Sequence, residues 1–198
     1  MTPLAAGSLP IGLYVAIALA AVALLWLGGT FNGLVRMRQH VWESWSDVDT
    51  ELKRRYDLIP ALVAVVKGYA AHERGALEAV ISARAAAAAS LGSPARQALD
   101  ENAFVRALRG LFLVAEHYPQ LKANANFLSL QQELANTEDR IQAARRFYNA
   151  NVRDLNTRIG IFPSNLVAGV FGFREAEFFE VESAGVRAVP VVQLGQQG

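Results

Sequence analysis

The chain has 198 residues, and its nineteen Lys and Arg nearly balance eighteen Asp and Glu, which excludes the strongly basic surface of a typical nucleic-acid-binding domain. It has no Cys, so disulfides, thiolate metal sites and a cysteine nucleophile are excluded as well. Charge is unevenly distributed, because no Lys, Arg, His, Asp or Glu precedes Arg36. This length predicts one soluble domain with a small appendage.

The appendage is a predicted transmembrane helix at 10–33, which follows a short N-terminal tail at 1–9. Ile11 to Leu27 is an unbroken apolar run, and about twenty such residues cross a hydrocarbon core of roughly 30 Å. A cleaved signal peptide would need a basic segment before this run and a small-x-small site after it, and neither is present. Arg36 and Arg38 follow the run, so the positive-inside rule predicts an N-terminus outside and a C-terminal domain in the cytoplasm.

An apolar stripe at helical spacing resumes directly after this segment. Its members recur at steps of three, four or seven: Leu34, Val41, Trp45, Val48, Leu52, Ile59, Leu62, Val66 and Tyr69. The membrane helix is therefore expected to run into the first bundle helix. Pro60 removes one internal hydrogen bond, which predicts a kink near Asp57 to Ile59. The helical pattern continues through Arg84 and ends at the segment 90–94.

A second helix is predicted to start with Ser93 as N-cap and Pro94 in its first turn. It is expected to stop near Tyr118. Its apolar face contains Leu99, Phe104, Leu108, Leu111, Phe112 and Ala115. A short connection then leads to Asn124 or Asn126 as the cap of the next helix.

The strongest periodic pattern in the chain belongs to that next helix. It places an apolar side chain at every seventh residue: Phe127, Leu134, Ile141, Tyr148, Leu155 and Phe162. Such a stripe is buried only against other helices, and a rod of this length spans roughly 50 Å. Short loops between long helices predict antiparallel neighbours. The predicted fold is therefore all-α: a transmembrane helix, then an antiparallel bundle of about three long helices at 34–182.

The C-terminal part is rich in aromatic residues. A short helix capped by Ser164 is predicted between Pro163 and Gly172, and five of the ten Phe lie in this part of the chain, at positions 162, 171, 173, 178 and 179. The favoured interpretation is that these rings close the bundle, and contact with a partner or with the membrane interface remains open. Residues 183–198 are predicted to be a disordered tail.

Signatures of common catalytic and metal sites are absent from the sequence. A metal site in a helical bundle needs Glu-x-x-His pairs, but Met37, Tyr69 and Val114 stand three residues before the three His. There is no His-Glu-x-x-His, phosphate-binding Gly loop or Gly-x-Ser-x-Gly. We therefore predict no catalytic residue, no cofactor and no metal.

Most charged residues are expected to lie on solvated helix faces. Glu51 with Arg55, and Asp154 with Arg158, have the acid-first spacing of exposed helical ion pairs. Arg145 and Arg146 are also expected at the surface, where they can grip an acidic partner or a lipid headgroup. Trp45 is expected in the core. For Trp42, the core, an interface and contact with another subunit all remain open.

Several segments of this chain resemble the LemA family of bacterial single-pass membrane proteins, over about residues 31 to 180. The matching stretches include Trp45-Ser-Asp-Val-Asp49, Leu52-Lys-Arg-Arg-Tyr-Asp-Leu-Ile-Pro60, Phe127-Leu-Ser-Leu-Gln-Gln-Glu-Leu134 and Phe162-Pro-Ser-Asn-Leu-Val-Ala-Gly-Val-Phe-Gly-Phe173. The resemblance implies an N-terminal anchor in the bacterial inner membrane and an all-helical soluble domain. It implies no reaction, because the family has no established activity or catalytic residues. Candidate interface or structural residues are Asn32, Trp42, Asp57, Pro60, Asn126, Gln131, Glu133, Arg145, Asn149, Pro163, Asn165, Gly169 and Phe171.

Three functional hypotheses follow. The leading one is a non-enzymatic scaffold or adaptor at the inner membrane, which partners with the lipid bilayer and either forms a homo-oligomer or recruits other membrane proteins. The second is an enzyme or ligand sensor with a polar pocket between helices, formed by Glu133, Glu138, Arg145 or Tyr148. The third is membrane remodelling by the aromatic C-terminal segment.

Overall fold

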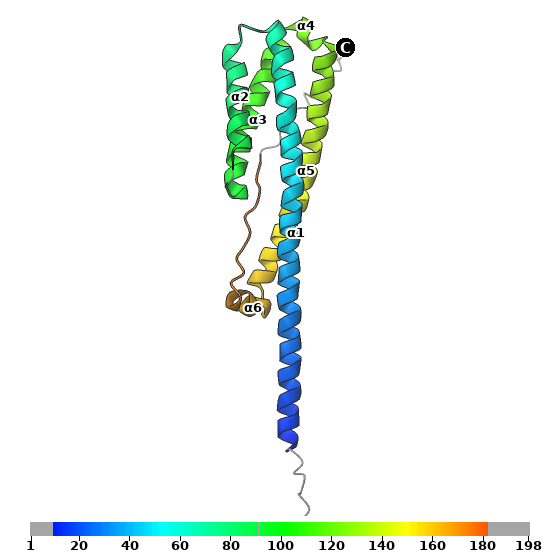
Figure 1. Ribbon diagram of the computed structural model, residues 1–198, viewed down its shortest axis with the longest axis vertical. Helices are drawn as coiled ribbons and strands as arrows, with labels where there is room; N and C mark the ends of the chain where they lie inside the picture. Colours follow the sequence, from blue (N-terminus) through cyan, green and yellow to red (C-terminus); the bar gives the residue numbers. More distant parts are fainter. Residues whose placement is uncertain (1–9, 91, 182–198) are drawn as a thin grey trace, which may run out of the picture.

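The computed structural model describes residues 10–90 and 92–181 and is all-α, as predicted. Four long helices form the molecule, and two short ones connect or close it (Figure 1). Their bounds are α1 Ile11–Tyr69, α2 Arg74–Ala88, α3 Pro94–Glu116, α4 Pro119–Lys122, α5 Ala125–Gly160 and α6 Ser164–Val170. The predicted tails at 1–9 and 183–198 lie outside the described residues.

Helix α1 is one unbroken helix of 59 residues. Its first part extends beyond the bundle (Figure 1), and its side chains from Ile11 to Trp26 are all exposed. Burial begins at Thr30 and Leu34 and then follows the predicted stripe. In the described part of the chain, α1 is the one helix long and apolar enough to cross a bilayer.

Pro60 does not interrupt α1, and Figure 1 shows no sharp bend where we expected a kink. Because proline has no N–H, the carbonyl of Tyr56 one turn earlier loses its usual intrahelical donor. The guanidinium Nε of Arg84 in α2 donates to that carbonyl oxygen over 2.7 Å. The Arg84 side chain of the neighbouring helix therefore supplies the hydrogen bond to the Tyr56 carbonyl that Pro60 cannot donate.

The main packing partners are α1 with α5 and α2 with α3. In the α1/α5 pair, Trp45 packs on Tyr148 with ring centroids 5.2 Å apart, and the Asn151 amide donates to the carbonyl of His40. A later residue of α5 thus meets an earlier residue of α1, so the two helices are antiparallel. The sequence analysis missed the turn at residues 70–73 and joined α1 and α2 into one pattern, so the bundle has four long helices instead of about three. No Gly or Pro lies inside this turn to mark it.

Both predicted helix starts are confirmed. The Ser93 hydroxyl accepts a hydrogen bond from the N–H of Arg96, and Asn124 accepts one from the N–H of Phe127 over 3.0 Å. Leu99 was predicted on the apolar face of α3, but it is 62% exposed, and the buried residues in this part of the helix are Gln97, Ala98, Glu101 and Phe104.

The aromatic residues of the C-terminal part differ in burial. Phe179 is fully buried against Trp45, with ring centroids 5.3 Å apart, so this ring closes the bundle as favoured. Phe162 was predicted as the sixth core member of the α5 stripe, but α5 ends at Gly160 and the Phe162 side chain is 78% exposed. Ser164 is also not a cap: its hydroxyl lies inside α6 and donates to the carbonyl of Arg158.

Candidate functional site

An extended segment after α6 returns along the bundle and is held by side chains of α5. We call residues 173–181 the strap. The Asn149 amide donates to the carbonyl oxygen of Phe179 and accepts from its N–H, both over 3.0 Å. Asn156 makes the same pair of bonds to Ala176, over 2.9 and 2.8 Å. Each asparagine therefore binds the main chain of one strap residue as a neighbouring strand would.

The spacing of the two asparagines matches the strap. Seven residues of helix separate Asn149 from Asn156, which corresponds to about 10 Å at the rise of an α-helix. Three residues of extended chain separate Ala176 from Phe179, which also corresponds to about 10 Å. Strap and α5 run antiparallel, and this common spacing lets both asparagines bond at once.

Further contacts hold the strap on both sides. The Tyr148 hydroxyl donates to the carbonyl of Glu177 over 2.8 Å, and Arg145 donates to the carbonyl of Val181. Burial, reinforced by the Glu177 carboxylate, raises the pKa of Tyr148 to about 12, so its hydroxyl stays a donor at neutral pH. From α3, the Asn102 amide donates to the carbonyl of Glu180 over 3.5 Å. The strap thus connects the α5 and α3 sides of the bundle.

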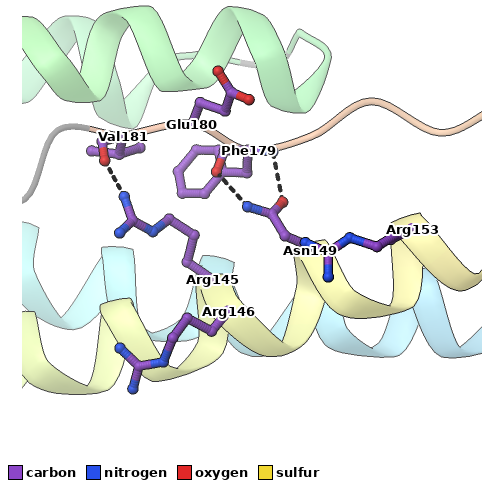
Figure 2. A pocket seen from close by; sticks show the side chains of 7 residues that line it. All are labelled: Arg145, Arg146, Asn149, Arg153, Phe179, Glu180 and Val181. Carbon is purple, nitrogen blue, oxygen red and sulfur yellow. Dashed lines mark hydrogen bonds between the residues drawn. The ribbon is translucent and has the colours of Figure 1, made fainter.

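A pocket of about 470 Å³ opens beside the end of the strap, lined by Arg145, Arg146, Asn149, Arg153, Phe179, Glu180 and Val181. Figure 2 shows that the Arg145 side chain points to the Val181 carbonyl, whereas those of Arg146 and Arg153 extend in other directions. The three guanidinium groups therefore do not converge on one point. The pocket is basic, but it is not assembled around a single ligand position.

A second polar arrangement lies inside the bundle, where three helices meet. The Arg55 guanidinium of α1 donates to Glu101 of α3 and, over 2.8 Å, to Glu138 of α5. The Tyr56 hydroxyl also donates to Glu101. Arg55 and Glu101 are 1% and 0% exposed, and the Arg55 guanidinium lies 5.2 Å from the ring centroid of Phe104. Two carboxylates thus share one buried cation.

Burial dominates the protonation behaviour of this network. It raises the pKa of Glu101, and the attraction of Arg55 opposes that rise without cancelling it. Burial and the Glu101 charge together raise the pKa of Tyr56, so the tyrosine remains a neutral donor. The hydrogen bonds of Arg55 to Glu101 and Glu138 connect α1, α3 and α5 in one register.

The residues named in the second hypothesis do not share a pocket. Glu133 is exposed, Glu138 bonds to Arg55, and Tyr148 and Arg145 hold the strap. Among the described residues no group of three His, Asp or Glu side chains is arranged to hold a metal ion. The three His, at 40, 72 and 117, are all exposed.

The predicted interface residues lie on several different parts of the molecule. Arg145 and Asn149 bind the strap, while Pro163, Asn165, Gly169 and Phe171 are exposed in and around α6. Trp42 is exposed on α1, with the Arg38 guanidinium 5.5 Å from its ring centroid. Of the remaining residues, Asn32, Asp57 and Pro60 are exposed on α1, Asn126 and Glu133 are exposed on α5, and Gln131 is half-buried there.

The sequence analysis missed the buried network. It placed Arg55 in an exposed pair with Glu51, but Glu51 lies 3.4 Å from Arg54 instead. A signal was available, because Arg55 lies seven residues from Val48 and from Leu62, so it occupies a core position of the stripe. Glu138 likewise lies four residues after Leu134 and three before Ile141. Charges at buried positions of a repeat indicate partners on neighbouring helices.

Comparison with known proteins gives a consistent result. A model described as the LemA family matches residues 44–194 of this chain. Magnetosome protein MamQ 2 of Paramagnetospirillum magneticum is 27% identical, over 84% of this chain and 71% of that protein. Magnetosome protein MamQ of Magnetospirillum gryphiswaldense is 24% identical over the same shares. Protein LemA of Metamycoplasma hominis is 25% identical, over 80% of this chain and 76% of that protein.

Proposed function

This chain belongs to the LemA family, and from that membership and its geometry we propose that it is a membrane-anchored, non-enzymatic scaffold or adaptor. It is a membrane-associated helical protein, and the relatives' names, magnetosome protein and LemA, name no reaction. In this proposal it acts by self-association or by recruiting other membrane proteins.

The observation that carries the proposal is the continuity of α1. One helix supplies both the exposed apolar segment from Ile11 onward and the central rod of the bundle up to Tyr69. An unbroken helix transmits position rigidly, so a partner bound to the bundle is held at a constant distance from the lipid. From Leu34 to Tyr69 this rod reaches about 50 Å.

The proposed location is the cytoplasmic face of the bacterial inner membrane, with a single span. Basic residues follow the apolar segment at Arg36 and Arg38, and none precedes it. This asymmetry supports an outside N-terminus and a cytoplasmic bundle.

Two exposed aromatic side chains are the proposed contact surface for a partner. Trp42 on α1 and Phe147 on α5 are both 59% exposed. They lie near one level of the α1/α5 pair, because Asn151 reaches the carbonyl of His40 and Tyr148 packs on Trp45. Exposed large aromatic residues are typical of protein contacts.

Thiol crosslinking tests this surface, since the chain has no Cys of its own. Trp42→Cys and Phe147→Cys are treated with a bifunctional reagent in intact membranes, and Leu113→Cys, which is 66% exposed on α3, is the control. We expect a dimeric adduct, or an adduct with one other membrane protein, at positions 42 and 147 only. Full chain that elutes as a strict monomer from detergent and gives no adduct at either position overturns the proposal.

Anion sensing is the alternative, and the basic pocket beside the strap is the observation that favours it. Arg146 and Arg153 line its 470 Å³ together with Arg145. If the pocket binds an anion, citrate or phosphate should raise the melting temperature of the wild type but not that of Arg146→Ala/Arg153→Ala. Equal melting temperatures with and without either anion would remove this alternative.

A further inference from the structure

Helix α6 has an unusual distribution of side chains. Its face toward the bundle is formed by small and medium residues, with Ser164, Val167 and Ala168 buried. The large apolar side chains lie on the other side. Leu166 and Val170, one turn apart in α6, are 60% and 80% exposed, and Phe162, two residues before the helix, is 78% exposed. In a soluble protein the solvent-exposed face of a helix is normally polar. The exposed face of α6 is apolar, which indicates that it contacts an apolar environment.

The position of α6 along α1 identifies that environment. Phe31 of α1 packs on Phe171 and Phe173, with ring centroids 4.8 and 5.8 Å apart. The helix from Ile11 to Phe31 rises about 30 Å, which equals the thickness of a hydrocarbon core. Figure 1 shows α6 at the end of the bundle nearest the exposed, apolar part of α1. Thus α6 lies where a bilayer crossed by that part would end.

Charge near α6 fits a lipid surface as well. Arg36 and Arg38 are exposed on α1 just beyond this level, and Arg174 follows α6. No Asp or Glu occurs between residues 31 and 42 or between 155 and 174. Exposed cations beside an apolar face complement anionic headgroups above acyl chains.

We infer that α6 and the preceding Phe162 form an interfacial element, in which Phe162, Leu166 and Val170 enter the headgroup and acyl boundary of the leaflet that α1 leaves. This inference rests on the proposed membrane span of α1. The bundle is then attached to the bilayer at two points, the span and α6. Two attachment points hold the bundle axis in a defined direction relative to the lipid surface.

Depth-dependent quenching tests the inference on the full chain. Single-Cys variants Val170→Cys, Leu24→Cys and Leu113→Cys are labelled with an environment-sensitive dye and reconstituted in vesicles of zwitterionic and anionic phospholipid. A nitroxide on the acyl chain should quench the dye at position 170 and at position 24 in the span, and leave position 113 unquenched. Quenching at 24 without quenching at 170 overturns the inference and leaves the anchor intact, whereas quenching at neither overturns the anchor itself.

A charge substitution separates lipid from a second copy of the chain. A dye at Phe162→Cys should lose its acyl-chain quenching and shift its emission to the red when Leu166→Glu and Val170→Glu are added. The matched control adds Leu99→Glu and Leu113→Glu, two exposed positions on α3, and should change neither signal. Emission at position 162 that depends on protein density but not on the lipid quencher would indicate contact between copies and overturn the inference.

Discussion

Arg55 of α1 connects three helices, because its guanidinium pairs with carboxylates of α3 and α5. It occupies a core position of the α1 stripe, yet its guanidinium neutralises Glu101 and Glu138 from α3 and α5. Pairs of this kind add little stability relative to a well-packed apolar core, but a single missing partner leaves buried charge behind. The network therefore makes the correct alignment of α1, α3 and α5 more favourable than a shifted one.

Arg55→Met should therefore strongly destabilise the folded state. Glu101 and Glu138 remain buried without a cation, and we expect a loss of about 3–5 kcal/mol in the free energy of unfolding. Denaturant unfolding of the detergent-solubilised chain measures it. Arg54→Met, one position away and half-exposed beside Glu51, should cost less than about 1 kcal/mol. Equal losses in the two variants would contradict the role of the network.

Glu101 should also give the stability a pH dependence. Its pKa is raised above the ordinary value of 4.5, so its contribution is complete below pH 4.5 and is lost as the pH rises through the folded-state pKa. Glu101→Gln cannot ionise and lacks this loss. The free energy of unfolding of the variant, measured relative to wild type, should therefore improve as the pH increases from 4.5. A difference that stays constant with pH would show that Glu101 does not titrate abnormally.

Arg84 and Pro60 should be coupled through the carbonyl of Tyr56. In the wild type, Arg84→Ala leaves this half-buried oxygen without a donor, at a cost of about 1–3 kcal/mol. In the Pro60→Ala background a backbone N–H is available at residue 60, so the same change should cost less. A double-mutant cycle measures the difference. Additive costs would mean that Arg84 acts through some other contact.

At the level of elements, the strap gives the bundle its closure. Asn149→Ala and Asn156→Ala each remove two bonds to the strap main chain, and each should cost about 1–3 kcal/mol. Hydrogen exchange at the amides of Phe179 and Ala176 should accelerate, because these N–H groups lose their acceptors. Asn136→Ala, an exposed position on α5 bonded to Gln132, is the control. Unchanged protection at both amides would contradict the strap assignment.

The elements also show what sequence patterns can predict. The α5 stripe, the Ser93 and Asn124 caps and the apolar segment of α1 depend on local spacing, and each was found. The strap was not, because its bonds join an asparagine to main-chain atoms about 20 to 30 residues away. Arg145 and Asn149 were named as candidates from a resemblance, whereas Asn156 carried no signal. In the buried ion network, the spacing of Arg55 and Glu138 indicates two charges at core positions, but it does not indicate which side chains on other helices they meet.

At the scale of the whole molecule, the boundary between the proposed span and the bundle lies near Thr30. A chain that starts at Thr30 keeps every buried residue of α1, so it should fold and stay soluble with helicity and melting temperature close to those of the full chain. A chain that starts at Ser44 loses Leu34 and Val41 from the core and should be less stable by about 3–6 kcal/mol. Circular dichroism melts compare the two. Aggregation of the longer fragment with loss of helicity would show that the bundle needs the apolar segment to fold.

The bonds from Asn149 and Asn156 to the strap also indicate which strap residues can be substituted. The side chains of Asn149 and Asn156 hydrogen-bond to peptide groups of the strap, and the strap's Glu175 and Phe178 side chains are exposed. Closure of the bundle therefore depends on the extended backbone of the strap, on the burial of Phe179 and on the side-chain amides of Asn149 and Asn156. Glu175 and Phe178 take no part in these bonds, so substitutions at either position should leave the closure of the bundle intact.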